Sequence, residues 1–430
     1  MPSTPHRFAW RARPPVAARA AGVLIALIAA GAWSCGGSAA PGSDEAAASA
    51  QAEPEAESPE PPDGGRGVFI RPKGKDVFRF EPWVSEEETN RLLRTLRRSA
   101  GGELHFTPGT YVVHQGFYLS STPDVRISGS PDVRLEFAPP PPVMPLTTES
   151  LHEGDRLMKV DDVSTLHVGW SYQLYAPDRD STRVLEFEIA GIEGDVIELK
   201  SPVTYMPMIQ EIPPGSRVLE EINFFKVIAC PGAVIEGFVM DGKGRGPVRG
   251  HTSYGGVYAT GLNPKNQRPT VHGLTVRDCA FRGLKGRGVA AYGIAEVRVT
   301  NNSFHDIFAQ AVEIDHFSSG YVANNLVDGA EVGVMINDAF ETVVEGNVLL
   351  RCQLGVRFLR IFPQDWVNVG NVVRNNRIGY CDHGVVFNDN LNPEEGVKGN
   401  YVLGNHFLGI TPFERVVNWT GNTVEGSTHD

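Results

Sequence analysis

Five short segments in the C-terminal half share one alternation of apolar and polar positions. They are GRGVAAYG ending at Gly293, AQAVEIDH ending at His316, EVGVMIND ending at Asp338, QLGVRFLR ending at Arg360 and DHGVVFND ending at Asp389. A period of two is typical of a strand that buries one face. The segments therefore predict equivalent strands whose buried columns are Val289, Val312, Val334, Val356 and Val385, and, two residues on, Ala291, Ile314, Ile336, Phe358 and Phe387.

An asparagine recurs at an equivalent turn position beside these strands. The residues are Asn302, Asn325, Asn347, Asn376, Asn405 and Asn422, and the first three intervals are 23, 22 and 29 residues. Repeats of this length, with short strands and no helical period, predict a solenoid whose coils bury their apolar columns against each other. Asparagine suits such a turn because it tolerates a left-handed backbone and its amide can bond to the next coil.

Two earlier segments extend this pattern towards the N-terminus. They are GGELHFTPGTYVV, from Gly101 to Val113, and AVIEGFVMDGKGRG, from Ala233 to Gly246. Together with the repeats they resemble the right-handed parallel β-helix proteins of the pectate-lyase-like superfamily, over roughly residues 67–425. The resemblance implies an all-β domain over 67–430 but no single activity, because one fold carries many functions.

Two parts of the domain depart from the repeat. VSEEETNRLLRTLRRSAGG has Ser85 as an N-cap, Glu88 as its capping-box partner and Gly101 as a stop, which predicts a short helix. The superfamily resemblance implies that this helix caps the N-terminal end of the solenoid. Residues from about 146 to 219 predict an inserted small β-module, which resembles modules of phage tailspikes and of polysaccharide-active enzymes.

The N-terminus has the pattern of an export signal. Several arginines precede the apolar run from Ala20 to Trp33, which is short for a membrane span, and Cys35 follows in AWSCGG. Residues 1–35 resemble a bacterial lipoprotein signal, with lipidation at Cys35, and simple secretion is the alternative. Residues 36–66, rich in Ala, Pro, Glu and Ser, predict a disordered tether. We therefore expect a protein of the bacterial cell envelope, in the outer membrane or periplasm, that contacts the membrane only through its lipid.

Charge and cysteine content narrow the function classes. Lys and Arg number 39 against 51 Asp and Glu, and the resulting net charge of -12 argues against nucleic acid as a partner. No CxxC pair is present, which argues against zinc. Cys352 and Cys381 occupy equivalent positions of their repeats, so they predict neighbours that form either a disulfide or a pair of stacked thiols.

Polar side chains between the buried columns project from the outer face of the predicted strands. One outer column holds Tyr258, Glu313 and Arg357, the next holds Tyr292, Asp315 and Asn337, and the strand ends carry His316, Asp338 and Arg360. Two loops border these columns and supply further substrate-binding candidates, which are Arg249, His251 and Tyr254 in one loop and Trp366 in the other. The alternative to a functional site is that these residues form the ordinary solvent-exposed face of a sheet, and that the loops are solvated or anchor the chain.

These residue types fit elimination or epimerisation at C5 of a uronic acid. The sugar carboxylate must be neutralised and a weakly acidic proton removed by a general base. Arg357 and Arg360 would supply positive charge, Asn337 an oxygen, and His316 or Tyr292 the proton transfers. Calcium held by Glu313, Asp315 and Asp338 is the alternative means of neutralisation.

Glycoside hydrolysis is the rival chemistry, since Asp315 and Asp338 lie on adjacent coils and could form a carboxyl pair. EIDH resembles the WIDH segment of pectate lyases, which implies Asp315 as a calcium ligand, although Glu313 stands at the tryptophan position. No complete motif of the lyases, alginate epimerases or polygalacturonases is present.

The sequence thus predicts an envelope-anchored enzyme acting on an acidic polysaccharide, a lyase or C5-epimerase before a hydrolase. A non-catalytic glycan-binding or structural β-helix remains open.

Overall fold

A computed structural model describes most of the chain beyond the N-terminal region. The signal, the tether and Cys35 lie outside the described residues, as do Arg249, His251 and Trp366. The described residues are 68–74, 78–80, 85–130, 132–177, 183–204, 211–246, 253–261, 270–361, 368–389, 399–409, 411–414, 419–420 and 422–425.

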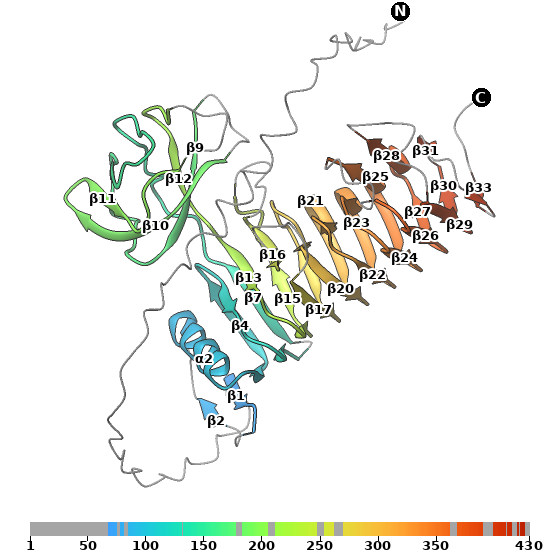
Figure 1. The fold of residues 1–430 in the computed structure, drawn as a ribbon, viewed down its shortest axis with the longest axis horizontal. Helices are drawn as coiled ribbons and strands as arrows, with labels where there is room; N and C mark the ends of the chain where they lie inside the picture. Colours follow the sequence, from blue (N-terminus) through green and yellow to red (C-terminus); the bar gives the residue numbers. More distant parts are fainter. Residues whose placement is uncertain are drawn as a thin grey trace, which may run out of the picture.

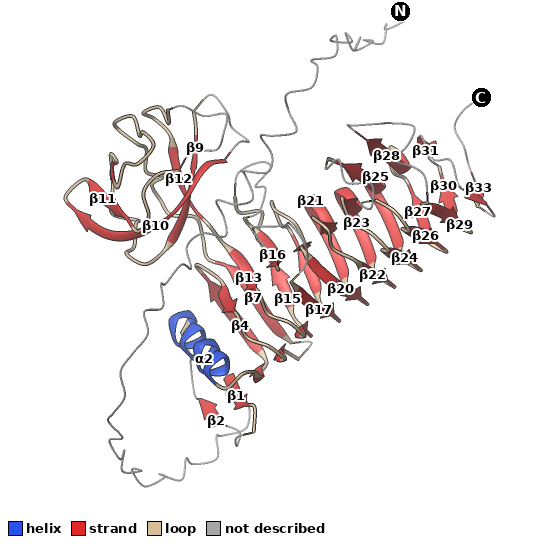
Figure 2. Cartoon of the chain, viewed as in Figure 1, coloured by secondary structure: helices blue, strands red, loops and turns tan. Residues whose placement is uncertain are grey.

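Parallel strands stack into a long right-handed β-helix (Figure 1, Figure 2). The strands of its first sheet, in spatial order, are β2 (Phe78–Phe80), β1 (Val68–Pro72), β3 (Gly102–Phe106), β6 (Val125–Ser128), β14 (Ala233–Glu236), β17 (Val271–Arg277), β20 (Ile294–Thr300), β22 (Gly320–Ala323), β24 (Val343–Glu345), β26 (Val372–Arg374), β29 (Tyr401–Leu403) and β32 (Trp419–Thr420). Only β1 and β2 pair antiparallel with their neighbours in this sheet, among the residues described.

The second sheet has two rows joined by a bend. Its first row contains β4 (Gly109–Val113), β7 (Val133–Phe137), β15 (Val239–Asp241), β18 (Ala280–Arg282), β21 (Ser303–Asp315), β23 (Leu326–Asn337), β25 (Val348–Arg360), β27 (Arg377–Gly379), β30 (His406–Leu408) and β33 (Thr423–Glu425). Its second row contains β5 (Phe117–Ser120), β13 (Asn223–Ile228), β16 (Gly255–Thr260), β19 (Val289–Tyr292), the C-terminal halves of β21, β23 and β25, then β28 (His383–Asp389) and β31 (Thr411–Glu414).

The buried columns follow the predicted register. Val289 pairs with Val312, which pairs with Val334, and Ala291, Ile314 and Ile336 form the parallel column. All of these side chains lie in one continuous apolar core. The prediction of an all-β parallel solenoid is therefore confirmed.

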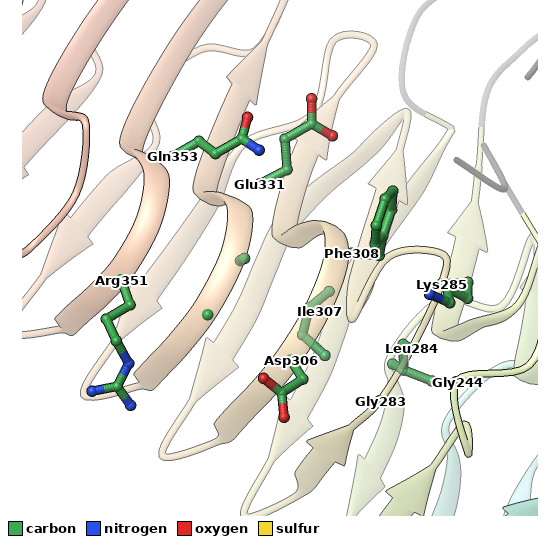
Figure 3. Close-up of a pocket in the computed structure, with 12 residues that line it drawn as sticks. Gly244, Gly283, Leu284, Lys285, Asp306, Ile307, Phe308, Glu331, Arg351 and Gln353 are labelled. Atoms are coloured by element: carbon green, nitrogen blue, oxygen red, sulfur yellow. The ribbon is translucent and has the colours of Figure 1, made fainter. Parts of the chain in front are cut away.

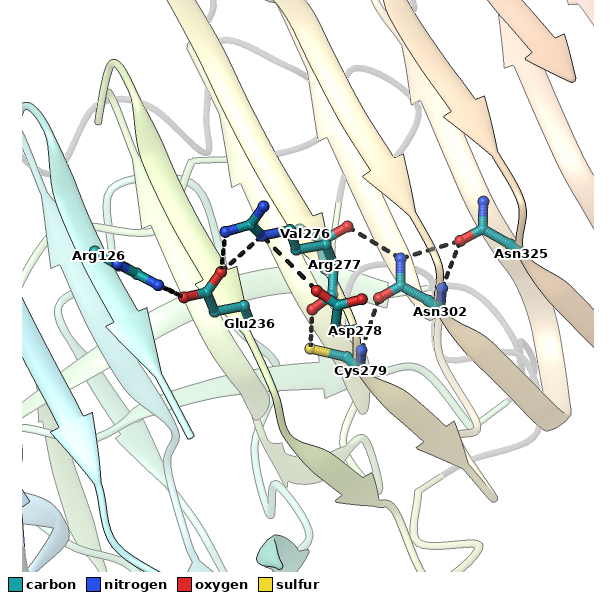
Figure 4. Close-up of polar contacts among 8 residues, drawn as sticks. All are labelled: Arg126, Glu236, Val276, Arg277, Asp278, Cys279, Asn302 and Asn325. Atoms are coloured by element: carbon teal, nitrogen blue, oxygen red, sulfur yellow. Dashed lines mark hydrogen bonds and ion pairs between the residues drawn. The ribbon is translucent and has the colours of Figure 1, made fainter. Parts of the chain in front are cut away.

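A ladder of asparagines fixes the turn between the first sheet and the second. Asn302 donates from Nδ2 to Oδ1 of Asn325 over 3.1 Å (Figure 4). Asn325 donates in the same way to Asn347 over 2.9 Å. Each Oδ1 also accepts the backbone N–H of the preceding asparagine. The ladder satisfies buried turn donors that no strand partner reaches. On the neighbouring outer face, Glu236 lies between Arg126 and Arg277 and pairs with both (Figure 4).

A helix, α2 (Glu86–Arg98), covers the N-terminal end of the solenoid (Figure 1). Ser85 Oγ accepts the N–H of Glu88 over 3.1 Å, as the capping-box pattern predicts. The helix buries Leu92, Leu93 and Leu96 in the solenoid core. Within the described part of the chain, no helix has the length and hydropathy of a membrane span.

The inserted module is a separate antiparallel sheet beside the N-terminal coils (Figure 1). Its strands, in spatial order, are β12 (Arg217–Glu220), β9 (Ser171–Tyr175), β10 (Arg183–Glu193), β11 (Val196–Leu199) and β8 (Leu157–Lys159). The module has its own apolar core. A buried guanidinium connects it to the solenoid, because Arg245 donates to the carbonyl of Ala138 over 2.7 Å and to Glu220 over 2.8 Å.

The cysteines described by the structure are buried free thiols. Of the two alternatives for Cys352 and Cys381, the structure has the thiols unlinked.

Candidate functional site

The predicted outer columns form on the second row of the second sheet. Glu313 pairs with Ala290 on one side and Met335 on the other, and Met335 pairs with Arg357. Asp315 pairs with Tyr292 and with Asn337 in the next column. Since Val312 and Ile314 point into the core, these polar side chains lie on the opposite face of the same strand.

This outer face is much less exposed than an ordinary wet face would be. The exposed fraction is 1% for Glu313, 2% for Asp315 and 5% for Asn337. Large side chains crowd the same face, among them Tyr292, Met335 and Leu359, which are also buried. Buried charges need partners, so each polar group here must be accounted for.

Glu313 is held by an arginine and a tyrosine. It forms an ion pair with Arg287, and Tyr292 donates its hydroxyl proton to Glu313 Oε2 over 2.9 Å. Arg287 Nε also donates to Gln310 Oε1 over 2.9 Å. Burial, together with the nearby carboxylate of Asp315, raises the pKa of Glu313, although Arg287 and the Tyr292 hydroxyl lower it. Burial also raises the pKa of Tyr292 well above its ordinary value, so this phenol stays protonated.

Asp315 forms a close pair with the next residue. Asp315 Oδ1 lies 2.6 Å from His316 Nδ1, and the His316 ring centroid is 5.2 Å from that of Tyr292. Burial lowers the pKa of His316, but the surrounding carboxylates of Asp315, Asp338 and Glu313 together raise it, so the pKa ends above its ordinary value. His316 has φ +50°, which turns the chain out of β21 at this point. We call Arg287, Tyr292, Glu313, Asp315 and His316 the polar cluster.

Two buried polar atoms beside the polar cluster have no hydrogen-bond partner in the structure. They are Oδ1 of Asn337, an acceptor, and Nε of Arg357, a donor. Asn337 pairs in register with Asp315, and Arg357 lies in the Glu313 column one coil beyond Met335. Burial lowers the pKa of Arg357, although a guanidinium remains charged near neutral pH. A buried acceptor and a buried donor without partners, on neighbouring strands, are the kind of groups that a ligand could satisfy.

Asp338 and Arg360 lie outside the polar cluster, at the C-terminal ends of β23 and β25. Asp338 is fully buried, and its Oδ1 accepts the N–H of Ile361 over 2.8 Å, so this carboxylate braces the backbone after β25. Arg360 is buried at the end of β25. Tyr258 is half-buried, with its ring centroid 5.5 Å from that of Tyr292, which places it at the edge of the polar cluster.

Tyr254 does not lie at the site. Its side chain is 1% exposed and belongs to the solenoid core, not to the outer face on which the substrate-binding candidates were expected. Its backbone has φ +60° just before β16, a conformation that points the ring inward.

Sequence reasoning missed Arg287 and Gln310. Both precede the apolar alternation of their strands. For Gln310, the register with β23 is interrupted just before it, between Ile307 and Gln310. The available signal was the polar residue two positions before each strand's first buried valine, which is Arg287 before Val289 and Gln310 before Val312.

The carboxylates do not fit the calcium hypothesis. In the described residues, no three His, Cys, Asp or Glu side chains are grouped to hold a metal ion. Glu313 is engaged by Arg287, Asp315 by His316, and Asp338 by the backbone. We therefore derive no chemistry from a bound cation.

Comparison with known protein families supports the architecture over the C-terminal part of the chain. A family model described as "Right handed beta helix region" matches residues 264–428. No curated protein matches the sequence. A hyperthermoactive exopolygalacturonase from Thermotoga maritima is similar at 12% identity and a TM-score of 0.45, over 79% of this chain and 88% of that one. The mannuronan C-5 epimerase A-module of Azotobacter vinelandii is similar at 9% identity and a TM-score of 0.32, over 79% of this chain and 96% of that one. With TM-scores below 0.5, these two similarities carry no argument.

Proposed function

We propose that the protein acts on an acidic polysaccharide as a lyase or C5-epimerase, with its reaction centre at His316. The observation that carries the proposal is the Asp315–His316 pair beside two orphaned buried atoms, Asn337 Oδ1 and Arg357 Nε. Anchoring of the protein at the bacterial cell envelope through Cys35 is a further part of the proposal and comes from the sequence alone.

His316 is the general base in this proposal. Asp315 Oδ1 lies 2.6 Å from Nδ1, and a proton held on Nδ1 by this carboxylate would leave the lone pair of the neutral ring on Nε2. A neutral imidazole with an elevated pKa is a stronger base than an ordinary histidine. It would remove the C5 proton of a uronic acid, whose acidity rises once the sugar carboxylate is neutralised.

Tyr292 and Arg357 supply the other two requirements. The Tyr292 hydroxyl stays protonated because burial raises its pKa. In this proposal it exchanges its bond to Glu313 Oε2 for one to the departing oxygen, or to the opposite face of C5, and donates its proton there. Arg357 Nε offers a donor to the substrate carboxylate, and Asn337 Oδ1 offers an acceptor to a sugar hydroxyl.

Hydrolysis is less well supported by the geometry. Its predicted pair was Asp315 with Asp338, and Asp338 is fully buried with Oδ1 bonded to the backbone. A hydrolytic acid or base needs a carboxyl group that reaches the glycosidic oxygen or a water, and the backbone bond of Asp338 competes with that role.

The test is an activity screen of residues 36–430 against uronate and neutral polysaccharides, with calcium or with a chelator. Lyase activity gives ultraviolet absorbance from unsaturated ends together with new reducing ends, and epimerase activity gives proton exchange at C5 without either. The matched pair of variants is His316→Ala and Arg298→Ala, the latter an exposed arginine of the first sheet.

We expect turnover to be lost in His316→Ala and retained in Arg298→Ala. Unchanged turnover in a combined Asp315, His316, Asn337 and Arg357 alanine variant would show that the reaction centre lies elsewhere. Reducing ends without absorbance would establish a hydrolase. Tight binding with no bond change or exchange would favour a non-catalytic glycan-binding protein. The low exposure of Glu313 and Asp315 is compatible with such a protein, because buried carboxylates need not take part in a reaction.

A further inference from the structure

A second feature lies on the outer surface at the bend between the two rows of the second sheet. It is a groove of about 480 Å³ that crosses successive coils (Figure 3). It is separate from the polar cluster, none of whose residues lines it. We call it the bend groove and define it by the three rows of residues described next.

The rows follow from the strand register. The floor is apolar and consists of Leu284, Ile307 and Ala330. One wall carries Gly283, Asp306, Gly329 and Arg351, and the other carries Lys285, Phe308, Glu331 and Gln353 (Figure 3). An apolar floor between two polar walls can hold an extended chain whose faces are apolar and whose edges are polar.

A β-bulge places an aromatic ring in one wall. Ile307 pairs with Ala330 but Gln310 pairs with Val332, so β21 has one more residue than β23 at the bend. Bulges of this kind re-aim a side chain. Here Phe308 is 39% exposed, unlike the buried phenylalanines of the core, and the Nζ of Lys285 lies 4.8 Å from its ring centroid.

The charges of the bend groove balance. Lys285 and Asp306 oppose each other in sign, as do Arg351 and Glu331. Arg351 is also paired with Asp328, which reduces its pull on an anion. A polyanion would therefore gain little from these walls, whereas hydroxyl groups could bond to either kind of charge and to Gln353.

We propose that the bend groove binds a neutral stretch of polysaccharide, with a sugar ring stacked on Phe308. The apolar C–H face of a sugar ring complements the face of an exposed aromatic ring, and its equatorial hydroxyls reach the polar walls. The groove holds glycan without reacting with it. This proposal does not rest on the reaction proposed at His316, because no residue is shared.

The test is affinity electrophoresis of the purified protein in gels containing soluble glucan, mannan, xylan or galactan, with polygalacturonate as the acidic comparison. Phe308→Ala is matched with Tyr401→Ala, which removes an aromatic side chain that is 46% exposed on the first sheet. Lys285→Ala is a second groove variant, and circular dichroism verifies that all variants are folded.

We expect at least one neutral polysaccharide to retard the wild type, with little dependence on salt. Phe308→Ala should weaken that retardation by about tenfold, Lys285→Ala by less, and Tyr401→Ala not at all. The proposal is overturned if no neutral polysaccharide retards the protein, if Phe308→Ala and Tyr401→Ala behave alike, or if only polygalacturonate binds in a salt-sensitive way. Retardation that survives in His316→Ala would uphold the bend groove even if no reaction is found.

Discussion

Asp315 controls the protonation of His316 through a contact of 2.6 Å between Oδ1 and Nδ1. Burial alone would lower the histidine pKa, and Asp315, with smaller contributions from Asp338 and Glu313, raises it above the ordinary value. A general base works in its neutral form, so activity should rise as pH passes upward through this pKa. Asp315→Asn removes the largest of the raising influences and keeps the burial, and we expect the acid limb of the pH–rate profile to move to lower pH.

The matched control is Asp278→Asn, at an exposed carboxylate whose positive φ asparagine also accepts. Its acid limb should coincide with that of the wild type. An acid limb that stays in place in Asp315→Asn would assign the titration to a group other than His316.

Substitutions of Glu313 and Arg287 test how much of the stability at this buried ion pair depends on keeping both charges together. Glu313→Gln leaves the Arg287 guanidinium without its carboxylate in a site that water barely reaches, and we expect about 3 kcal/mol of destabilisation in urea unfolding. The double variant Glu313→Gln with Arg287→Met removes the stranded charge and should recover much of that loss. Equal destabilisation of the single and double variants would mean that packing, not charge, dominates at this position.

Alternation along one strand predicted which side chains of β21 face the core, because each strand has only two faces and Val312 and Ile314 are both apolar. It could not predict how deeply the opposite face is buried, since crowding by Tyr292 and Leu359 comes from other coils. Tyr254 was misplaced because a single positive φ reverses the direction of a side chain without any sign in the pattern.

At the scale of elements, the asparagine ladder repeats one turn interaction, and its members should contribute different amounts to the free energy of unfolding. Asn347 Oδ1 accepts both the N–H and the Nδ2 of Asn325, and its own Nδ2 donates to the carbonyl of Val322 and to Asn376. Asn347→Ala strands several of these buried groups, and we expect about 3 kcal/mol of destabilisation. Asn422, at the last rung, is half-buried, so Asn422→Ala should cost about 1 kcal/mol.

Chemical denaturation of both asparagine variants measures this difference. Similar losses at the two positions would indicate that the ladder acts through turn conformation, which every rung shares, and not through buried hydrogen bonds.

The strands could be predicted from the sequence because the coil repeats, and the helix because Ser85 and Glu88 form a local capping signal. The bend of the second sheet could not be predicted from the sequence. The extra residue between Ile307 and Gln310 leaves regular alternation on both sides, so the bulge that exposes Phe308 appears only in the pairing with β23.

At the scale of the whole molecule, each coil contacts only its neighbours, and α2 protects one end of the solenoid (Figure 1). Stability in such an array is approximately a sum of terms from coils and their interfaces, so damage near an end need not spread. Phe407 in β30 and Phe304 in β21 are both fully buried. Replacement of either by alanine removes an aromatic ring from the core, at a cost of about 3–5 kcal/mol.

Hydrogen exchange should separate these two replacements. Phe407→Ala should lower the protection of β29, β30 and β33, near one end, while β21 and β23 stay protected and the site at His316 keeps its acid limb. Phe304→Ala lies between neighbours on both sides and stacks on Phe281 at 4.7 Å, so protection should fall in β18 and β23 alike. Uniform loss of protection in Phe407→Ala would mean that the solenoid unfolds as one cooperative unit, and the site would then depend on every coil.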